Sequence, residues 1–583
     1  MEGKILKFAV YGKGGIGKST VACNVSVALA QMGEKVLQIG ASPKVDSTAF
    51  LYGGKILQPD ILTSTRISAS KANLMACIKE GYAGVMIGES GGPEPATGCA
   101  GRGVAAALDL TVKYKTLEEL GITVAIYDVL GDVVCGGFAK PMESGFADSI
   151  VIVTSGELMA LYAANNLCIA VKELLERKPG MHIRVAGLIN NMRGVDREEE
   201  IVEAYAKRLG VKVLAHIPRS GVVQEAEEAG GTVVEKRPDS EQAKIYRQLA
   251  ENIRDNKDLV VPKPMDLEEV LELIKGYSQP LDKKEVKLTP MAEVIESKQD
   301  WAHLGRKDKA RKLIAIYGKG GIGKSTVSAN VSAALSRMGE TVLQMGCDPK
   351  RDSIATLCGK LMPTILDTMR GNDGAMTDEL MVSLVHKGYC GVLGMESGGP
   401  RPGVGCAGAG VMESLKQLEQ YNILDRYKIT FAIFDVLGDV VCGGFAQPMR
   451  AGYAREVYIV ACGEVLTLIQ INNIAKSIKK IHDRGIDCAC AGIINNMRGV
   501  KNEEKIVEAV AEKMGLPVIM HVPRSQTVQD AEFYSRTVID IFPDSDQAKV
   551  YQTLATKILH NKDVFVPNPL SLEEVRAIIT KLE

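Results

Sequence analysis

A nine-residue segment, GKGGIGKST, occurs twice in this chain of 583 residues, at Gly12–Thr20 and at Gly318–Thr326. Each copy follows a short apolar run, Leu6–Tyr11 or Leu313–Tyr317, and precedes a stretch with the apolar spacing of a helix. A strand, a glycine-rich loop and a helix in this order are typical of a phosphate-binding loop. The sequence therefore predicts two nucleotide sites in one chain.

The residues of each loop suit a triphosphate and its magnesium ion. Glycines let the backbone turn tightly enough for several N–H groups to face the phosphates, and the following helix N-terminus adds positive potential. The loop lysine should reach the β- and γ-phosphates, and the serine after it should bind Mg²⁺. The alternative is a glycine-rich turn that binds no nucleotide. The predicted nucleotide-binding residues are Gly12, Gly14, Gly15, Gly17, Lys18, Ser19 and Thr20, and in the second copy Gly318, Gly320, Gly321, Gly323, Lys324, Ser325 and Thr326.

The duplication extends over almost the whole chain. The second copy follows the first at a nearly constant shift, and the copies end alike, in NKDLVVPKPMDLEEV and NKDVFVPNPLSLEEV. We expect a first domain at residues 1–278, a charged linker at 279–311 that contains the only tryptophan, Trp301, and a second domain at 312–583. Fully extended, such a linker spans about 100 Å at ~3.3 Å per residue, enough to let the halves face each other.

Short apolar runs alternate with helical segments in each copy. Alternation of this kind predicts an α/β fold: two tandem phosphate-loop NTPase domains, each a mostly parallel sheet with helices on both faces and ligand loops at the carboxyl ends of the strands. The expected strands of the first copy are Leu6–Tyr11, Lys35–Ile39, Val124–Tyr127, Ile150–Val153 and Val185–Ile189, and its clearest helices are Val21–Met32 and Leu158–Leu175.

Composition is that of an ordinary soluble globular protein. Lys+Arg of 70 against Asp+Glu of 71 leave a formal net charge of −1, so nucleic acid is not indicated as a partner. We find no signal segment and no apolar run long enough to span a bilayer, and we expect a cytoplasmic protein that does not bind membranes. In that compartment the thirteen cysteines should be buried residues or ligands and not disulfides.

Four cysteines lie in glycine-rich contexts that both halves share. Cys99 lies in GGPEPATGCAGRGV and Cys406 in GGPRPGVGCAGAGV, whereas Cys135 and Cys442 lie in identical copies of DVLGDVVCGGFA. Each half thus supplies two thiolates, and an iron–sulfur cubane needs four. If the halves meet about a pseudo-two-fold axis, one 4Fe–4S cluster can bridge them through these four cysteines.

Two alternatives exist for these four cysteines: a zinc site of four thiolates, or buried structural residues. The spacing lacks the short Cys-x-x-Cys pairs of structural zinc sites. Other cysteines do not recur between the halves, which argues against a merely structural role. Cys23, Cys77 and Cys168, for example, align with Ala329, Leu384 and Ala475.

Together these motifs resemble those of a known family. GKGGIGKST, GCDPK-x-DS, GGP-x-P-x-x-GCAG and DVLGDVVCGGFA, in this order, are similar to the motifs of the nitrogenase iron protein and its relatives, and the resemblance covers each half apart from the linker. Those proteins are ATP-dependent reductases, homodimers that hold one 4Fe–4S cluster between subunits and pass single electrons to a partner metalloprotein. This chain looks like such a dimer fused into one polypeptide.

The resemblance implies roles for the aspartates of the DVLGD segments. Asp128 and Asp435 match the aspartate that helps to hold the Mg²⁺ shell, and Asp132 and Asp439 match the one that orients or activates the attacking water. The same short segment would touch the γ-phosphate at one end and a cluster ligand at the other. That arrangement offers a route by which hydrolysis could move the ligand.

Further residues match the family pattern one by one. The lysine after the first loop glycine matches one that reaches the nucleotide of the other subunit, although a solvated surface lysine is the alternative. For the other matches, a capped helix or a turn is the alternative. The matches are the lysines Lys13 and Lys319, the switch aspartates Asp46 and Asp352, the adenine-contacting Asn191 and Asn496, and the base-side loop residues Pro218, Arg219, Pro523 and Arg524.

The halves differ beside the nucleotide. The second contains GCDPKRDS where the first contains GASPKVDS, so Ser42 replaces the aspartate that Asp348 provides. Because a carboxylate is lost there, we expect the two halves to hydrolyse ATP or to switch at different rates. Arg102, which matches an arginine of the docking surface, aligns with Ala409. The docking surface should therefore be asymmetric too.

We therefore expect MgATP-dependent electron transfer from ferredoxin or flavodoxin, through the bridging cluster, to a partner with its own metal cluster, such as a nitrogenase-like or double-cubane cluster protein. The fused chain should behave as a monomer. One alternative is an iron–sulfur carrier or assembly ATPase, which generally bridges its cluster with a compact Cys-x-x-Cys. Another is a positioning ATPase of the partition type, which would not need the four cysteines.

Overall fold

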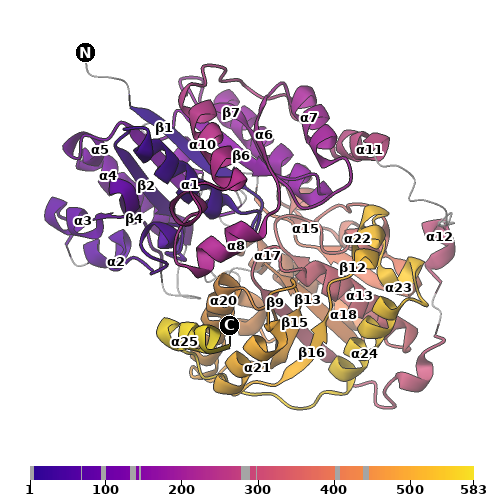
Figure 1. The fold of residues 1–583 in the computed structure, drawn as a ribbon. Coiled ribbons are helices and arrows are strands. Elements are labelled where there is room, and N and C mark those ends of the chain that lie inside the picture. Colours follow the sequence, from indigo (N-terminus) through magenta and orange to yellow (C-terminus); the bar gives the residue numbers. More distant parts are fainter. Residues whose placement is uncertain are drawn as a thin grey trace. The chain divides into compact units, whose positions relative to one another are not determined.

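The computed structural model describes residues 5–66, 68–93, 100–131, 139–143, 146–277, 289–296, 299–400, 407–437 and 446–582. These residues form two compact units: the described part of the first unit ends at Tyr277, and that of the second begins at Thr289. Each unit contains one eight-stranded sheet, and corresponding strands have the same order in both. Figure 1 shows the helices that surround the strands of each unit.

The sheet of the first unit is parallel except at one edge. Among its described strands, only β3 runs antiparallel, against β4. The central strand β1 pairs with both β5 and β6, so the loop after it leaves from the middle of the sheet. Across the sheet the order is β3 (Lys79–Glu80), β4 (Met86–Glu89), β2 (Val36–Ala41), β5 (Val124–Val129), β1 (Leu6–Gly12), β6 (Ser149–Thr154), β7 (Arg184–Asn191) and β8 (Val213–Ile217).

Helices cover both faces of this sheet. Successive side chains of a strand point to opposite faces. Phe8 and Val10 share one buried cluster with side chains of α1 (Lys18–Gln31) and α10 (Glu241–Arg254). Ala9, between them, faces the other side, where α6 (Leu158–Arg177) contacts β1, β6 and β7. The other helices are α2 (Ile61–Thr65), α3 (Lys71–Cys77), α4 (Ala100–Lys113), α5 (Thr116–Glu119), α7 (Glu198–Leu209), α8 (Gly221–Glu228), α9 (Val233–Lys236), α11 (Leu267–Tyr277) and the short η1 (Ala49–Leu51), η2 (Tyr82–Gly84) and η3 (Lys140–Met142).

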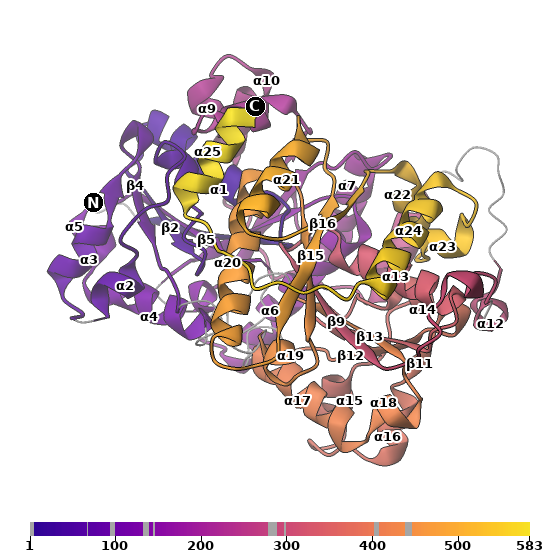
Figure 2. The ribbon, with the colours of Figure 1, turned by 90° about the horizontal axis from the view of Figure 1, so that it is seen from below.

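The second unit repeats this arrangement. Its strands, in order across the sheet, are β11 (His386–Lys387), β12 (Leu393–Glu396), β10 (Val342–Cys347), β13 (Phe431–Val436), β9 (Lys312–Gly318), β14 (Glu456–Ala461), β15 (Ala489–Asn496) and β16 (Val518–Val522). Its helices are α12 (Met291–Val294), α13 (Lys324–Arg337), α14 (Ala355–Cys358), α15 (Ile365–Gly371), α16 (Asp378–Ser383), α17 (Ala407–Gln420), α18 (Ile423–Arg426), α19 (Gln447–Arg450), α20 (Val465–His482), α21 (Glu503–Lys513), α22 (Gln526–Phe533), α23 (Val538–Ile541), α24 (Asp546–His560) and α25 (Leu572–Leu582), with η4 (Ala302–Leu304) and η5 (Tyr389–Gly391). In Figure 2, α25 lies beside α20 and α21, which it contacts. The predicted fold class is thus confirmed.

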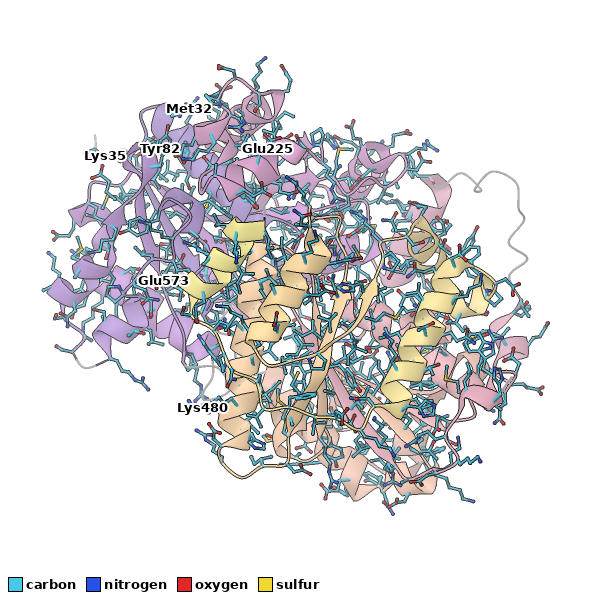
Figure 3. All side chains as sticks on the ribbon, turned by 60° about the horizontal axis from the view of Figure 1, so that its bottom comes forward. Met32, Lys35, Tyr82, Glu225, Lys480 and Glu573 are labelled. Atoms are coloured by element: carbon cyan, nitrogen blue, oxygen red, sulfur yellow. The ribbon has the colours of Figure 1, made fainter. Side chains whose placement is uncertain are left out.

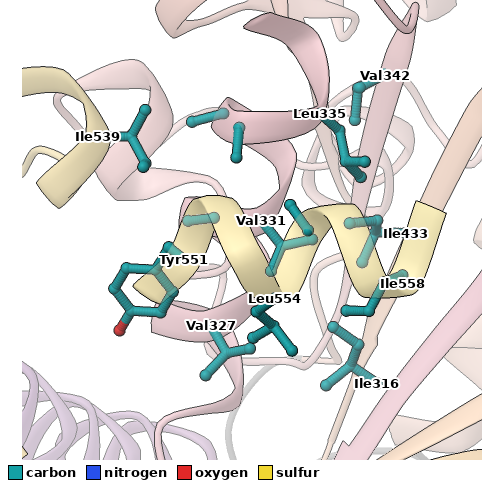
Figure 4. Packing of buried hydrophobic residues seen from close by; sticks show 14 of the residues in the cluster. Ile316, Val327, Val331, Leu335, Val342, Ile433, Ile539, Tyr551, Leu554 and Ile558 are labelled. Carbon is teal, nitrogen blue, oxygen red and sulfur yellow. The ribbon is translucent and has the colours of Figure 1, made fainter. Parts of the chain in front are cut away.

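The core between helices and sheet follows from helical spacing of apolar residues. Tyr551, Leu554 and Ile558 lie on one face of α24, at most 1% exposed. They pack beside Val327 and Val331 of α13 above the strands (Figure 4). Residues three or four apart share a helix face, so each helix presents one continuous apolar stripe. This packing fixes the start of α13, which directly follows the second phosphate loop.

Helix α6 is, within the described part of the chain, the one helix long and apolar enough to cross a membrane. Its apolar side chains, among them Leu161, Leu167 and Val171, are buried. The helix packs against three strands and against α11. Its composition is therefore that of a core helix of the first unit.

Part of the segment expected to act as a linker packs against the second unit. We call residues 289–296 and 299–311 the strap. The indole of Trp301 lies under the Arg337 guanidinium, 3.8 Å from its carbon to the ring centre, and Asp300 forms an ion pair with the same arginine. The side chain of Glu340 is fully buried. Its carboxylate forms ion pairs with the Arg306 guanidinium at 2.9 Å and the Lys309 ammonium at 2.8 Å. The strap thus belongs to the second unit.

The corresponding surface of the first unit has no such cover among the described residues. Tyr82 is 40% exposed there, beside Met32 (Figure 3). Its counterpart in the second unit, Tyr389, is 4% exposed.

Replacing Arg337 with alanine should destabilise the second unit by about 2 kcal/mol, because the stacking on Trp301 and the partly buried pair with Asp300 are both lost. Trp301 is the only tryptophan, so its fluorescence during urea unfolding measures this unit alone. The matched control is Gln31→Ala, at the equivalent position of the first unit, which should leave the transition unchanged. Equal midpoints for Arg337→Ala and the unmodified chain would contradict the role assigned to the strap.

Candidate functional site

Both GKGGIGKST segments adopt a conformation that requires glycine. Gly12 and Gly17 have φ angles of 147° and 98°, and Gly318 and Gly323 have 155° and 95°. A Cβ on Gly12 would lie 2.1 Å from the carbonyl oxygen of Val153. The loop therefore lies directly against the strand end, and Gly17 and Gly323 are the last residues before α1 and α13.

The loop lysines point into their own loops. The Nζ of Lys18 donates to the carbonyls of Gly12 at 3.0 Å and Lys13 at 3.1 Å. The Nζ of Lys324 donates to Lys319 at 3.2 Å. Both side chains are buried. A cation enclosed by a loop at a helix N-terminus is a ready site for phosphate oxygens.

A buried carboxylate lies beside each loop, at the end of β5 or β13. Asp128 accepts a hydrogen bond from Ser47 at 2.5 Å through Oδ2, while its Oδ1 is buried without a hydrogen-bond partner. In Asp435 it is Oδ2 that has none. Burial raises the pKa of both carboxyls, against the lowering effect of Ser19 or Ser325 and of the loop lysine. An acceptor oxygen without a partner next to the loop serine fits a hard cation such as Mg²⁺.

The substitution of Ser42 for aspartate removes a charge but keeps the turn. The Oγ of Ser42 accepts from the backbone N–H of Lys44 at 3.2 Å, as the Oδ1 of Asp348 accepts from Lys350 at 3.0 Å. Burial raises the pKa of Asp348 to about 7, and the charge of Lys350 opposes this. The two halves therefore differ here in charge and not in backbone hydrogen bonding.

The extra lysines pair with glutamates of their own unit. The Nζ of Lys13 lies 3.9 Å from Glu157, and that of Lys319 lies 3.6 Å from Glu464. Each glutamate directly precedes a long helix, α6 or α20. The expected reach of these lysines to the other half stays a prediction. The glutamates have no motif of their own, and sequence analysis missed them.

The asparagines expected to contact adenine lie against the phosphate loops. The Nδ2 of Asn191 donates to the carbonyl of Ile16, and that of Asn496 donates to Ile322, both at 2.6 Å. A Cβ on Gly17 would lie 2.4 Å from the Asn191 nitrogen. The structure therefore brings the NNMR segments to the site, and these asparagines hold the loop.

The base-side loops follow β8 and β16. Pro218, Arg219, Pro523 and Arg524 are exposed there. The serine after each pair, Ser220 or Ser525, caps the next helix, so these residues are held at the start of α8 or α22.

Two further contacts were missing from the sequence-based prediction. Arg193 of the first NNMR segment donates to the carbonyl of Gly15 at 2.6 Å, and Arg498 does the same to Gly321. Thr20, next to the loop serine, donates to Glu227 of α8 at 2.6 Å. These contacts join the loop to the base-side segments. The repetition of NNMR in both halves was the available signal for the arginines.

The four predicted cluster ligands, Cys99, Cys135, Cys406 and Cys442, lie outside the described residues, as do Asp132 and Asp439. The other nine cysteines are described, and each is a buried residue that forms no disulfide. Burial raises the pKa of Cys168 to about 12, so that thiol stays protonated. The described cysteines are thus buried residues, and the ligand role of the other four stays a prediction.

A family model described as "4Fe-4S iron sulfur cluster binding proteins, NifH/frxC family" matches residues 6–279 and 312–583. The chain belongs to this family. It is similar to a nitrogenase iron protein of Methanospirillum hungatei, 48% identical over 271 residues, 46% of this chain and 94% of that protein. It is also similar to nitrogenase iron protein 2 of Methanothermobacter thermautotrophicus, 47% identical over 270 residues, 46% of this chain and 98% of that protein.

Among solved structures, a cell division ATPase MinD of Pyrococcus furiosus is similar with a TM-score of 0.35 and 23% identity, over 42% of this chain and 98% of that chain.

The two nitrogenase iron proteins are each covered almost completely by less than half of this chain. This member of the NifH/frxC family therefore contains two copies of the family's domain, and the resemblance seen in the motifs is confirmed.

Proposed function

We propose that this chain is an ATP-dependent reductase in which both halves bind MgATP and share one 4Fe–4S cluster. Ferredoxin or flavodoxin would supply low-potential electrons, and the acceptor would be a protein with its own metal cluster. The donor and acceptor are inferred from the family. The shared cluster is inferred from the count of two motif cysteines in each half and four thiolates in a cubane.

The position of Asp128 and Asp435 supports this proposal most directly. Each is the last residue but one of a central strand, lies beside the loop lysine and serine, and has a buried oxygen without a hydrogen-bond partner. The chain continues from each aspartate to a motif cysteine seven residues later, Cys135 or Cys442. A residue that would hold Mg²⁺ and a residue that would hold iron thus lie on one short segment.

The residues of each half would divide the work of hydrolysis. The loop N–H groups and Lys18 or Lys324 bind the phosphates, and the lysine exchanges its carbonyl partners for phosphate oxygens. Ser19 and Asp128, or Ser325 and Asp435, would hold Mg²⁺, and the ion would supply positive charge to the phosphates. Asp132 and Asp439 would orient the attacking water, and Lys13 and Lys319 would each reach the nucleotide of the other half. The cluster, when bound, accepts and donates single electrons.

The proposal is tested on the anaerobically purified chain of 62.7 kDa. It should be a monomer with about four iron atoms, as one cubane requires. It should bind two MgADP, one for each loop. Oxidation of the reduced chain by its acceptor should require MgATP. Zinc in place of iron, iron for two cubanes in a monomer, or cluster transfer to an apo-protein without electron delivery would each contradict the proposal.

Unequal hydrolysis in the two halves is the expected consequence of Ser42. Loss of one charged group beside a reacting phosphate commonly costs a few kcal/mol in the transition state, or about a hundredfold in rate. Because the Ser42 turn keeps its backbone hydrogen bond, nucleotide binding should survive in the first half. Lys324→Ala should therefore reduce the first turnover more than Lys18→Ala does.

Rapid-quench measurement of phosphate released per chain separates the two halves before a second turnover begins. We expect two phases in the unmodified chain. Ser42→Asp should bring the phases together, and the reciprocal Asp348→Ser should remove the fast one. Two equal and simultaneous phases in the unmodified chain would show that Ser42 is a neutral replacement.

A further inference from the structure

In each unit, a buried glutamate that the proposed hydrolysis does not use ends the strand next to β2 or β10. Glu89 and Glu396 are the last residues of β4 and β12, and their relative exposures are 0% and 1%. Burial raises the pKa of Glu89 to about 8, although a hydrogen bond from Thr48 lowers it. Burial also raises the pKa of Glu396 well above its ordinary value. Burying a carboxyl group costs stability. A glutamate that is buried at the same position in both units is therefore a candidate for a functional role.

One oxygen of each glutamate holds the segment that contains the switch aspartate. The Oε1 of Glu89 accepts from both the backbone N–H and the hydroxyl of Thr48, each at 2.7 Å. Ser47, the residue before Thr48, donates a hydrogen bond to Asp128 at 2.5 Å. Glu89 therefore fixes the chain next to Asp46 at the point where it contacts the predicted Mg²⁺ ligand.

The second oxygen lies against the start of the same segment. A Cβ on Gly40 would lie 1.9 Å from the Oε2 of Glu89, and one on Gly346 would lie 2.0 Å from the Oε2 of Glu396. The Cα of each glycine is thus in close contact with the carboxyl group. Only glycine leaves room for the glutamate there.

The chain after each glutamate contacts this segment as well. The backbone N–H of Ser90 donates to the carbonyl of Gly40 at 2.8 Å. A Cβ on Gly92 would lie 2.3 Å from the Cβ of Pro43. In the second unit Ser397 and Gly346 form the same hydrogen bond at 2.8 Å. The switch segment and the strand end therefore pack without free space between them, and seven residues beyond Gly92 the chain reaches Cys99.

We propose that Glu89 and Glu396 are positioning residues that link the switch segments, residues 40–48 and 346–354, to the strand ends that lead to Cys99 and Cys406. A nucleotide-dependent shift of residues 40–48 would then move residues 90–92 with it, because packed contacts of this kind move together. This link is separate from the one along Asp128 to Cys135. It rests on the proposed function for its nucleotide and its cluster ligands.

The two halves hold their glutamates differently. Thr48 gives Glu89 two hydrogen bonds, whereas Ile354 in the same position gives Glu396 only its backbone N–H, at 2.8 Å. The link in the second half should therefore be weaker. The pair also supplies matched variants, Thr48→Ile and Ile354→Thr.

Hydrogen exchange of the full chain, with and without MgADP, tests the link. In the unmodified chain MgADP should slow or speed exchange at residues 90–92 and 397–399. Glu89→Leu keeps the size of the side chain but removes the acceptor, so the MgADP effect at 90–92 should fall at least fivefold while that at 397–399 stays. The affinity for MgADP should change less than threefold. In Glu89→Gln the amide oxygen can still accept the hydrogen bonds from Thr48. The MgADP effect at residues 90–92 should therefore stay within about twofold of that in the unmodified chain.

The possible results distinguish failure of the proposed link from failure of the proposed function. If Glu89→Leu keeps the MgADP effect, or if Glu89→Gln loses as much as Glu89→Leu, the link through Thr48 is wrong. If Glu89→Leu does not fold, Thr48→Ile should still reduce the effect, and an unchanged effect overturns the proposal. An unmodified chain that binds MgADP without any change at residues 90–92 overturns the link alone. An unmodified chain that binds no MgADP overturns the proposed function.

Discussion

Changing Cys135 or Cys442 to serine should reduce the iron content of the chain from about four atoms to nearly none, because a cubane that loses one of four thiolates is not retained. Serine is isosteric with cysteine, but its hydroxyl stays protonated near neutral pH and is a hard ligand, whereas iron–sulfur clusters select soft thiolates. Iron analysis, visible absorption and the EPR spectrum of the reduced protein measure the loss.

A buried cysteine supplies the matched control for this prediction. Cys168 aligns with Ala475 in the second half, so Cys168→Ala introduces a residue that the same fold already accommodates. That variant should keep its full iron content. Full iron in Cys135→Ser would show that the shared cluster is wrong, and loss of iron in Cys168→Ala would show that iron content reflects stability and not ligation.

The sheet and its main helices were predictable because local signals agree with the tertiary structure there. The predicted strand Val124–Tyr127 lies within β5, and the predicted helix Leu158–Leu175 lies within α6. The predicted helix Val21–Met32 ends within one residue of α1, and Gly33, just beyond it, has a φ of 93°. The short strands β4 and β8 were missed because their few residues give no period to recognise.

The strap shows where composition misleads. Its many charged residues indicate a solvated linker, yet a few contacts place it on the second unit. Val294 is buried in the core, and Trp301 stacks on Arg337. Glu340, which pairs with Arg306 and Lys309, belongs to the turn after α13 and gives no sign of these partners in the sequence. Contacts between segments far apart in sequence have no local signal.

The site was predictable where glycines and lysines form a motif, and less so where single side chains support it. The phosphate loops and the buried Asp128 and Asp435 lie where the motifs place them. Glu89 was not singled out, because a glutamate at the end of a strand is read as a solvated residue by default. Its burial follows only from the pairing of β4 with β2, which packs the carboxyl against Gly40.

Changing Asp435 to asparagine should reduce MgATP hydrolysis in the second half by at least about a hundredfold, equivalent to roughly 3 kcal/mol in the transition state. The side chain is 2% exposed and has one oxygen without a hydrogen-bond partner. The amide keeps the shape but removes the negative charge that Mg²⁺ requires. Phosphate release in the first turnover measures the loss, and the first half should continue to hydrolyse.

The same variant should have an opposite effect on the stability of the unliganded chain. Burial raises the folded-state pKa of Asp435, so the folded state retains its proton above the ordinary pKa of about 4, where the unfolded chain loses it. The free energy of unfolding therefore falls as pH rises from about 4 through the folded-state pKa. Asparagine does not titrate and removes this loss. Near neutral pH, Asp435→Asn should unfold at an equal or higher urea concentration, which Trp301 fluorescence reports.

Measuring both hydrolysis and stability of Asp435→Asn distinguishes a functional carboxylate from a structural one. Asp425→Asn, at a surface side chain that is 60% exposed and pairs with Arg311, should change neither hydrolysis nor stability appreciably. If Asp435→Asn lost activity together with stability, the aspartate would be a structural residue of the unliganded fold. If it lost neither, Mg²⁺ would be held elsewhere. Lower activity with unchanged or higher stability is expected only where a buried charge is retained for its ligand.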